Sequence, residues 1–128
     1  VLRGLHYQLP PYTQAKLVRV IEGSVLDIAV DIRKSSPTFG QHVSVELTEE
    51  NKHQLFVPHG FAHGFVVLSD SATFAYKVDN YYAPEHDRGI AFDDVKLGID
   101  WRLALEKLQL SDKDKVHPNL CNAIDLFE

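Results

Sequence analysis

The chain has 128 residues, 45% of which are hydrophobic, and this size and composition suit one globular domain and exclude a largely disordered chain. The formal net charge of −5 excludes a broadly basic nucleic-acid surface, because binding to phosphates requires an excess of positive charge. The single cysteine, Cys121, cannot form an internal disulfide, and no apolar run approaches the roughly 18 residues of a membrane-spanning helix. We therefore expect one domain over residues 1–128, in the cytoplasm, without nucleic-acid or membrane partners.

Short apolar or alternating stretches predict β-strands along most of the chain. The first is at the N-terminus, where Val1 begins the chain without a methionine, and we therefore expect that an N-terminal segment is missing. Turn-forming residues separate the strands at intervals of about 8–12 residues, which is typical of a sandwich or barrel. Towards the C-terminus, 101–110 predicts a short helix. The other predicted strands are 16–20, 25–32, 42–47, 54–58, 64–68 and 73–78.

Three strands carry a polar side chain among apolar neighbours. Alternation places Lys16, His63 and Tyr76 each on a face with aromatic or aliphatic residues. Taken singly, each is most simply interpreted as a core or surface residue with an ordinary hydrogen bond. Taken together, they come from separate strands of one small fold, and polar groups that converge in an apolar cavity are the general signature of a site.

The N-terminal strand adds two further candidates, Arg3 and His6. Strict alternation places them on opposite faces, although a β-bulge at Gly4 would reorient one of them. The polar stretches 51–54 and 84–88 are interpreted as solvated turns.

A metal site is the main competing interpretation, because the chain has seven histidines. Metal-binding barrels of the cupin type usually carry an H-x-H pair followed by a glutamate on one strand. Here His6 stands alone and is followed by Tyr7 and Gln8, which supply neither the nitrogen nor the carboxylate that a first-row metal prefers. The later stretch PHGFAH at 58–63 does resemble the second cupin motif, P-x-G-x-x-H. The sequence therefore favours a cupin-like fold without a metal.

Seven motifs occur in an order that chance does not explain: VLRGLHYQ, QAKLVRV, DIAVDIRKSSPTFG, VPHGFAHGFVVLSD, FAYKVDNYYAPEHDRGIAFDD, GIDW and LSDKD. Together they resemble the dTDP-4-dehydrorhamnose 3,5-epimerase family over nearly the whole chain. The resemblance implies an all-β, cupin-like jelly-roll barrel with short C-terminal helical segments, no cofactor or metal, and a homodimer. It also implies epimerisation of a dTDP-4-keto-6-deoxy sugar at carbons 3 and 5, in dTDP-L-rhamnose biosynthesis.

The resemblance also assigns roles to the catalytic candidates. An imidazole is largely neutral at pH 7, so His6 is expected to be the base that removes a proton next to the 4-ketone. Asp114 is expected to pair with His6 and fix its tautomer. Lys16 is expected to stabilise the enolate oxygen, and Tyr76 to return a proton from the opposite face.

The expected substrate-binding residues are His63, Arg3 and Tyr81. By resemblance, His63 hydrogen-bonds the substrate, Arg3 binds the sugar or pyrophosphate, and Tyr81 stacks on the thymine base. Two alternatives stay open: a related dTDP-sugar 3-epimerase or 3,4-ketoisomerase, and a cupin that binds a nucleotide-sugar without catalysis. A silent binder would be expected to lack the base or the acid, so the presence of both favours an enzyme.

Overall fold

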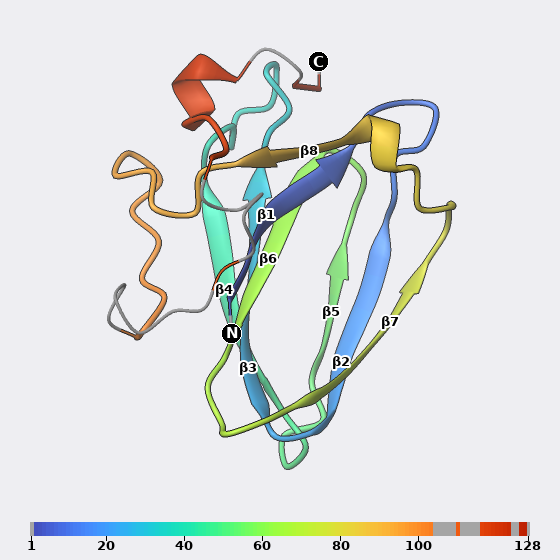
Figure 1. Ribbon diagram of the computed structural model, residues 1–128, viewed down its shortest axis with the longest axis vertical. Coiled ribbons are helices and arrows are strands. Elements are labelled where there is room, and N and C mark those ends of the chain that lie inside the picture. The colour runs from blue at the N-terminus through green and yellow to red at the C-terminus, as the bar shows by residue number, and fades with distance from the viewer. Residues whose placement is uncertain (1, 104–109, 111–115, 124–125, 128) are drawn as a thin grey trace.

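Two antiparallel β-sheets make up the fold in the computed structural model, which describes residues 2–103, 110, 116–123 and 126–127. The strands are β1 (Leu2–Gln8), β2 (Lys16–Glu22), β3 (Ser24–Asp31), β4 (His42–Thr48), β5 (Gln54–Val57), β6 (Phe61–Val67), β7 (Thr73–Val78) and β8 (Asp87–Ile90), and the short 3-10 helices are η1 (Pro84–His86) and η4 (Leu120–Asn122). The larger sheet has the order β4-β3-β6-β1-β8, and the smaller has the order β5-β2-β7. Figure 1 shows the smaller sheet along one side of the molecule.

The six strands predicted within the chain are confirmed, and their ends shift by at most three residues, the largest shift being at the start of β6. The N-terminal strand is also confirmed, as β1. The interpretation of 84–88 as a solvated turn is wrong at its end, because Asp87 and Arg88 begin β8, which pairs with β1. The predicted helix at 101–110 lies mostly outside the described residues.

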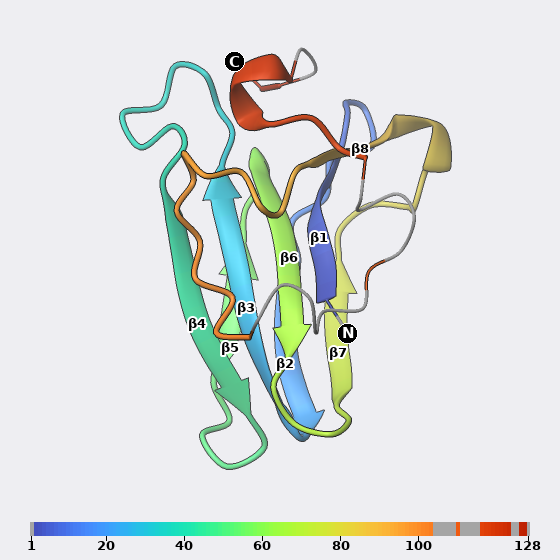
Figure 2. The same cartoon turned by 60° about the vertical axis from the view of Figure 1, so that its left-hand side comes forward.

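Strand β3 is buried on both faces, which explains its nearly continuous apolar sequence. On its outer face, Leu26, Ile28 and Val30 join a core that includes residues from the C-terminal part of the chain. One of these is Trp101, whose indole N–H donates to the Phe92 carbonyl at 2.9 Å. Figure 2 shows the chain after β8 crossing this face of the sheet. The outer face of β3 is thereby covered, and the space between the two sheets is the side on which a site can form.

Strand β1 contains an irregularity that places two of its polar residues on the same cavity. Arg3 pairs with Phe65 and His6 with His63, so three steps along β1 match two along β6. The extra residue on β1 forms a β-bulge. A bulge at Gly4 is the alternative to strict alternation that the sequence offers for this strand. Gly64 permits the close approach, because a Cβ atom there would lie 2.7 Å from the Arg3 carbonyl oxygen. Arg3 and His6 consequently both line the space between the sheets.

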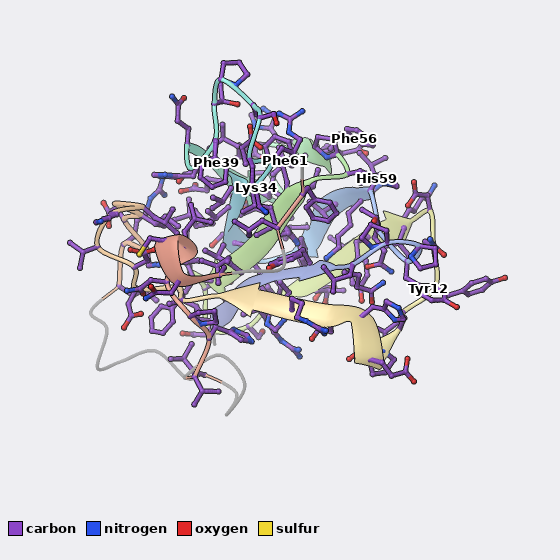
Figure 3. All side chains as sticks on the ribbon, turned by 90° about the horizontal axis from the view of Figure 1, so that it is seen from above. Tyr12, Lys34, Phe39, Phe56, His59 and Phe61 are labelled. Carbon is purple, nitrogen blue, oxygen red and sulfur yellow. The ribbon has the colours of Figure 1, made fainter. Side chains whose placement is uncertain are left out.

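The loop after β3 is held by the buried side chain of Asp31. Its carboxylate accepts hydrogen bonds from the Arg33 guanidinium at 2.9 Å and from the hydroxyls of Ser36 at 2.6 Å and Thr38 at 2.5 Å. Burial alone would raise the pKa of Asp31, but these hydrogen bonds outweigh burial and hold the pKa far below its usual range. The guanidinium also lies 5.0 Å from the Phe61 ring, which Figure 3 shows close to this loop.

Candidate active site

An open cavity of about 830 Å³ lies between the two sheets, and this volume is within the range of small-molecule sites. Strands β1, β6 and β8 of the larger sheet form one wall, and β2 and β7 of the smaller sheet form the other. Polar side chains face the cavity from both walls. The larger sheet contributes Arg3, His6, His63 and Asp87, and the smaller sheet contributes Lys16 and Tyr76.

His6 lies at the centre of the first wall, beside a carboxylate. Its Nδ1 atom is 3.5 Å from Oδ2 of Asp87 on the neighbouring strand β8, and the two side chains are 24% and 14% exposed. A carboxylate beside one ring nitrogen orients the imidazole and favours the tautomer with the proton on that nitrogen. Nε2 of His6 is then the nitrogen that can accept a proton.

His63 is held by a second carboxylate. It is opposite His6 in the pairing of β1 with β6, and its Nε2 atom is 2.6 Å from Oδ1 of Asp27 on β3. Both side chains are buried, with exposures of 7% and 0%. Among the described residues, Oδ2 of Asp27 has no hydrogen-bond partner. A buried carboxylate of this kind fixes the imidazole and leaves the site with negative charge that a cation can offset.

Lys16 supplies that cation from the facing sheet. Its neighbours Val18 and Val20 on the same strand face are buried, as alternation predicts. Burial lowers the pKa of Lys16 below its ordinary value, and attraction to Asp27 and Asp87 opposes this effect. The ammonium group is thus partly desolvated, and a partly desolvated cation interacts more strongly with a developing anion than one in bulk water.

An aromatic surface lines the cavity next to these polar groups. The rings of Phe65 and Phe74 are 4.6 Å apart, and the Tyr76 ring is 6.2 Å from that of Phe74. Tyr76 faces the cavity, as the alternation in β7 predicts, and its side chain is accessible there. The cavity therefore joins a polar region, suited to a sugar, to an apolar region that accepts a non-polar substituent.

Two adjacent tyrosines follow β7, and only one of them lines the cavity. Tyr82 belongs to the lining, whereas Tyr81 does not and is 83% exposed. The Gln8 side chain holds this segment against β1, since its Nε2 donates to the Tyr81 carbonyl at 3.0 Å and its Oε1 accepts from the Ala83 amide at 3.0 Å. Tyr82 is thus the tyrosine of this pair that the structure brings to the cavity.

His6 Nδ1 and His63 Nε2 each lie beside a carboxylate, and in the part of the chain that the structure describes no three His, Cys, Asp or Glu side chains are grouped to hold an ion. In the same part of the chain, no helix is long and apolar enough to cross a membrane.

The model of the dTDP-4-dehydrorhamnose 3,5-epimerase family matches residues 1–122. The chain belongs to this family. A dTDP-4-dehydrorhamnose 3,5-epimerase from Shigella flexneri is 59% identical to it over 114 residues, which are 89% of this chain and 62% of the relative.

Two solved structures in the comparison carry bound sugar nucleotides. A dTDP-6-deoxy-D-glucose-3,5-epimerase from Legionella pneumophila Philadelphia 1, in complex with dTDP-4-keto-L-rhamnose, is 55% identical with a TM-score of 0.90, covering 94% of this chain and 63% of that one. ChmJ, a 3'-monoepimerase from Streptomyces bikiniensis in complex with dTDP-quinovose, is 36% identical with a TM-score of 0.87, covering 94% of this chain and 61% of that one. The chain thus spans less than two thirds of the length of these relatives. The agreement confirms the cupin-like all-β fold class.

The structure brings five of the predicted site residues to one cavity, namely Arg3, His6, Lys16, His63 and Tyr76. Asp114 lies outside the described residues, and Tyr81 lies outside the cavity lining. Sequence reasoning missed Asp27, Asp87 and Tyr82. A signal existed for Asp27, because a carboxylate within the apolar stretch VLDIAV needs a buried partner.

Proposed function

We propose that the chain carries the catalytic core of a dTDP-4-dehydrorhamnose 3,5-epimerase, which converts dTDP-4-dehydro-6-deoxy-D-glucose to dTDP-4-dehydro-L-rhamnose in dTDP-L-rhamnose biosynthesis. The observation that supports it most is the placement of His6 and Tyr76 on facing walls of one cavity, with Lys16 on the wall of Tyr76. Inversion beside a ketone needs a base on one face of the sugar, an acid on the other and a cation for the enolate. Carbons 3 and 5 both flank the 4-ketone, so one cavity serves both.

In the first step, Nε2 of His6 removes the proton from carbon 3 or carbon 5. The electron pair of the broken C–H bond becomes the enolate π bond, and the ketone oxygen gains negative charge. The Lys16 ammonium stabilises this charge, because it lies in the same cavity in a partly desolvated position. Asp87, next to Nδ1, stabilises the imidazolium that forms.

In the second step, the Tyr76 hydroxyl gives its proton to the same carbon from the opposite face. The C–H bond forms there, the enolate returns to the ketone, and the configuration is inverted. The Tyr76 phenolate and the His6 imidazolium regain their starting states by exchange with water. These transfers need no metal or organic cofactor, because each proton has a donor and an acceptor among the side chains.

The remaining cavity residues are proposed to hold the sugar nucleotide. Arg3 carries the charge that a pyrophosphate requires. His63, fixed by Asp27, hydrogen-bonds the sugar. Tyr82, which is exposed and lines the cavity, is proposed to stack on the thymine base, a role that the family resemblance gives to Tyr81.

Two carboxylates are proposed to act on His6. The structure supports Asp87 by its distance of 3.5 Å, and the family resemblance supports Asp114. Either would orient the imidazole. Variants of Asp87 and of Asp114 separate the contributions of the two carboxylates.

We also propose that the protein is a homodimer in the cytoplasm. Support for a dimer comes from the outer face of the smaller sheet, where Leu17 and Phe56 are cross-strand neighbours with exposures of 37% and 61%. Figure 3 shows Phe56 at the edge of the molecule. Apolar pairs exposed in this way mark association surfaces. Light scattering should give twice the mass of one chain, and a single-chain mass at micromolar concentration would contradict the dimer.

A 3-epimerase is the second candidate, because the similar ChmJ is a 3'-monoepimerase. Incubation with dTDP-4-dehydro-6-deoxy-D-glucose, followed by reduction of the ketone and NMR of the sugar, separates the candidates. We expect inversion at both carbons. Inversion at carbon 3 alone would assign a 3-epimerase, and an unchanged sugar despite binding would assign a non-catalytic nucleotide-sugar binder.

A further inference from the structure

His117 lies against the proposed base from outside the cavity lining. Its ring centroid is 5.2 Å from that of His6, and the two ring planes meet at 86°, an edge-to-face contact. His117 is far from His6 in the sequence and comes three residues before Leu120, which packs in the core on the outer face of the larger sheet. Its role is not accounted for by the proposed reaction.

Strand β8 leaves a place for this ring. In the pairing of β1 with β8, Gly89 is directly opposite His6, and residues 87 and 89 project to the same face of the sheet. A Cβ atom on Gly89 would overlap the His117 ring. The missing side chain at Gly89 is thus replaced by His117, so the imidazole of His6 has Asp87 and His117 as its neighbours along β8.

The backbone next to His117 is fixed to the segment that directly follows β8. The Ala91 amide donates to the Pro118 carbonyl at 2.8 Å, and the Leu120 amide donates to the Asp94 carboxylate at 2.8 Å. The segment that carries His117 therefore keeps a defined position relative to β8 and β1. A side chain held in this way restricts the ring that it touches.

We propose that His117 is a positioning residue, which holds the His6 ring at the angle at which Nδ1 faces Asp87 and Nε2 faces the cavity. The proposal rests on the proposed function for the catalytic role of His6. The ring contact between His117 and His6 is independent of that function. An imidazole that is free to rotate spends part of its time with Nε2 turned from the substrate, and small errors of placement cost large factors in proton transfer. The angle of His6 is therefore a property that His117 controls.

The first test measures His6 without any substrate. In protein labelled with ¹⁵N-histidine, the two ring nitrogens report the tautomer, and the His6→Gln variant assigns the His6 signals. We expect one dominant tautomer with the proton on Nδ1 in the unchanged protein, a mixture in His117→Ala, and recovery in His117→Phe, which keeps an aromatic ring. Unchanged His6 signals in His117→Ala, or loss of the single tautomer in His117→Phe as well, would overturn the proposal.

The second test uses a double-mutant cycle between residues 89 and 117. Gly89→Ala should displace the His117 ring and give the same His6 spectrum as His117→Ala, while in the His117→Ala background it should add little, since the space is then free. If epimerase activity is present, His117→Ala should lower kcat about tenfold with KM within about twofold. Additive effects of the two changes on the His6 spectrum would contradict the shared contact. Absence of any activity would refute the proposed function but leave both spectral tests valid.

Discussion

His6 and His63 lie directly opposite each other on neighbouring strands, and each has a carboxylate of its own. The His63 pair with Asp27 is buried at 2.6 Å, whereas the His6 pair with Asp87 is longer, at 3.5 Å, and more exposed. Two similar imidazoles therefore have different surroundings. The tight buried pair suits a fixed hydrogen-bonding group, and the looser pair suits a ring that gains and loses a proton.

Replacement of the proposed base should stop the chemistry at its first step. In His6→Gln, we expect hydrogen exchange and inversion at both carbons to fall by about 10³-fold or more, since general-base catalysis contributes typically 10²–10⁴-fold. The exposed His53→Gln is the matched control and should keep the original rate. Solvent exchange that persists in His6→Gln would mean that another residue removes the proton.

The two carboxylates assigned to His6 make separate predictions. Asp87→Asn should reduce exchange less than His6→Gln, because it disturbs the orientation of the base without removing it. If both carboxylates act, Asp114→Asn should also reduce exchange, and the double variant should lose less than the product of the two factors. A normal rate in Asp87→Asn would leave the contact between Asp87 and His6 with a structural role only.

Tyr76→Phe should separate proton removal from inversion. The ring keeps its shape against Phe74, so the base still works, but no hydroxyl returns a proton from the second face. His6 can return a solvent proton to the face from which it came, which gives labelled sugar without inversion. We expect the ratio of deuterium incorporation to inversion, measured by mass spectrometry and NMR on one sample, to rise strongly. An equal fall in both would place Tyr76 in binding or in proton removal instead.

Lys16 should titrate below the ordinary lysine value, because burial lowers its pKa in the folded state. A lysine with a lowered folded pKa destabilises the fold while it is protonated in both states. This penalty is fully present below the folded pKa and disappears as the pH rises towards the unfolded value. The unfolding free energy of the unchanged protein, minus that of Lys16→Met, should therefore increase as the pH rises from the folded to the unfolded pKa of Lys16. A pH-independent difference, or a Lys16 side-chain NMR titration at the ordinary lysine value, would contradict the partly desolvated position.

Asp31→Asn should destabilise the fold without touching the site. The change weakens a buried, charge-assisted network with Arg33, Ser36 and Thr38, and we expect a loss of about 3 kcal/mol in the free energy of unfolding at pH 7. The folded pKa of Asp31 is lowered, so its contribution is present above the usual carboxyl pKa of about 4 and is lost as the pH falls below it. Denaturant titrations at pH 7 and pH 3 check this. If Asp31→Asn lowered the free energy of unfolding by the same amount at both pH values, the lowered pKa of Asp31 would be contradicted.

Local patterns predict the strands well here, because β2, β3, β6 and β7 carry strong apolar alternation or continuous apolar runs. They fail for β8, whose charged sequence forms a strand only because β1 offers hydrogen-bond partners at that edge. Alternation also identifies the inward faces of Lys16 and Tyr76.

The site is less predictable than the strands, because it depends on contacts between distant segments. Asp87 reaches His6 through the pairing of β8 with β1, and the Arg3 side chain shares the cavity with His6 only because of the bulge opposite Gly64. Tyr82 rather than Tyr81 lines the cavity, in a segment whose backbone is hydrogen-bonded to the distant Gln8 side chain. Of these relationships, the bulge alone has a local sequence signal, which is Gly4 between Arg3 and His6.

Proton removal by His6 and proton return by Tyr76 are tested most directly by incubation with dTDP-4-dehydro-6-deoxy-D-glucose in deuterated water, followed by mass spectrometry and NMR of the recovered sugar. Enolate formation on both sides of the ketone predicts one deuterium at carbon 3 and one at carbon 5, with the configuration inverted at each. Inverted product without deuterium at either carbon would contradict proton removal by His6 and return by Tyr76, and so would a sugar recovered without label or inversion.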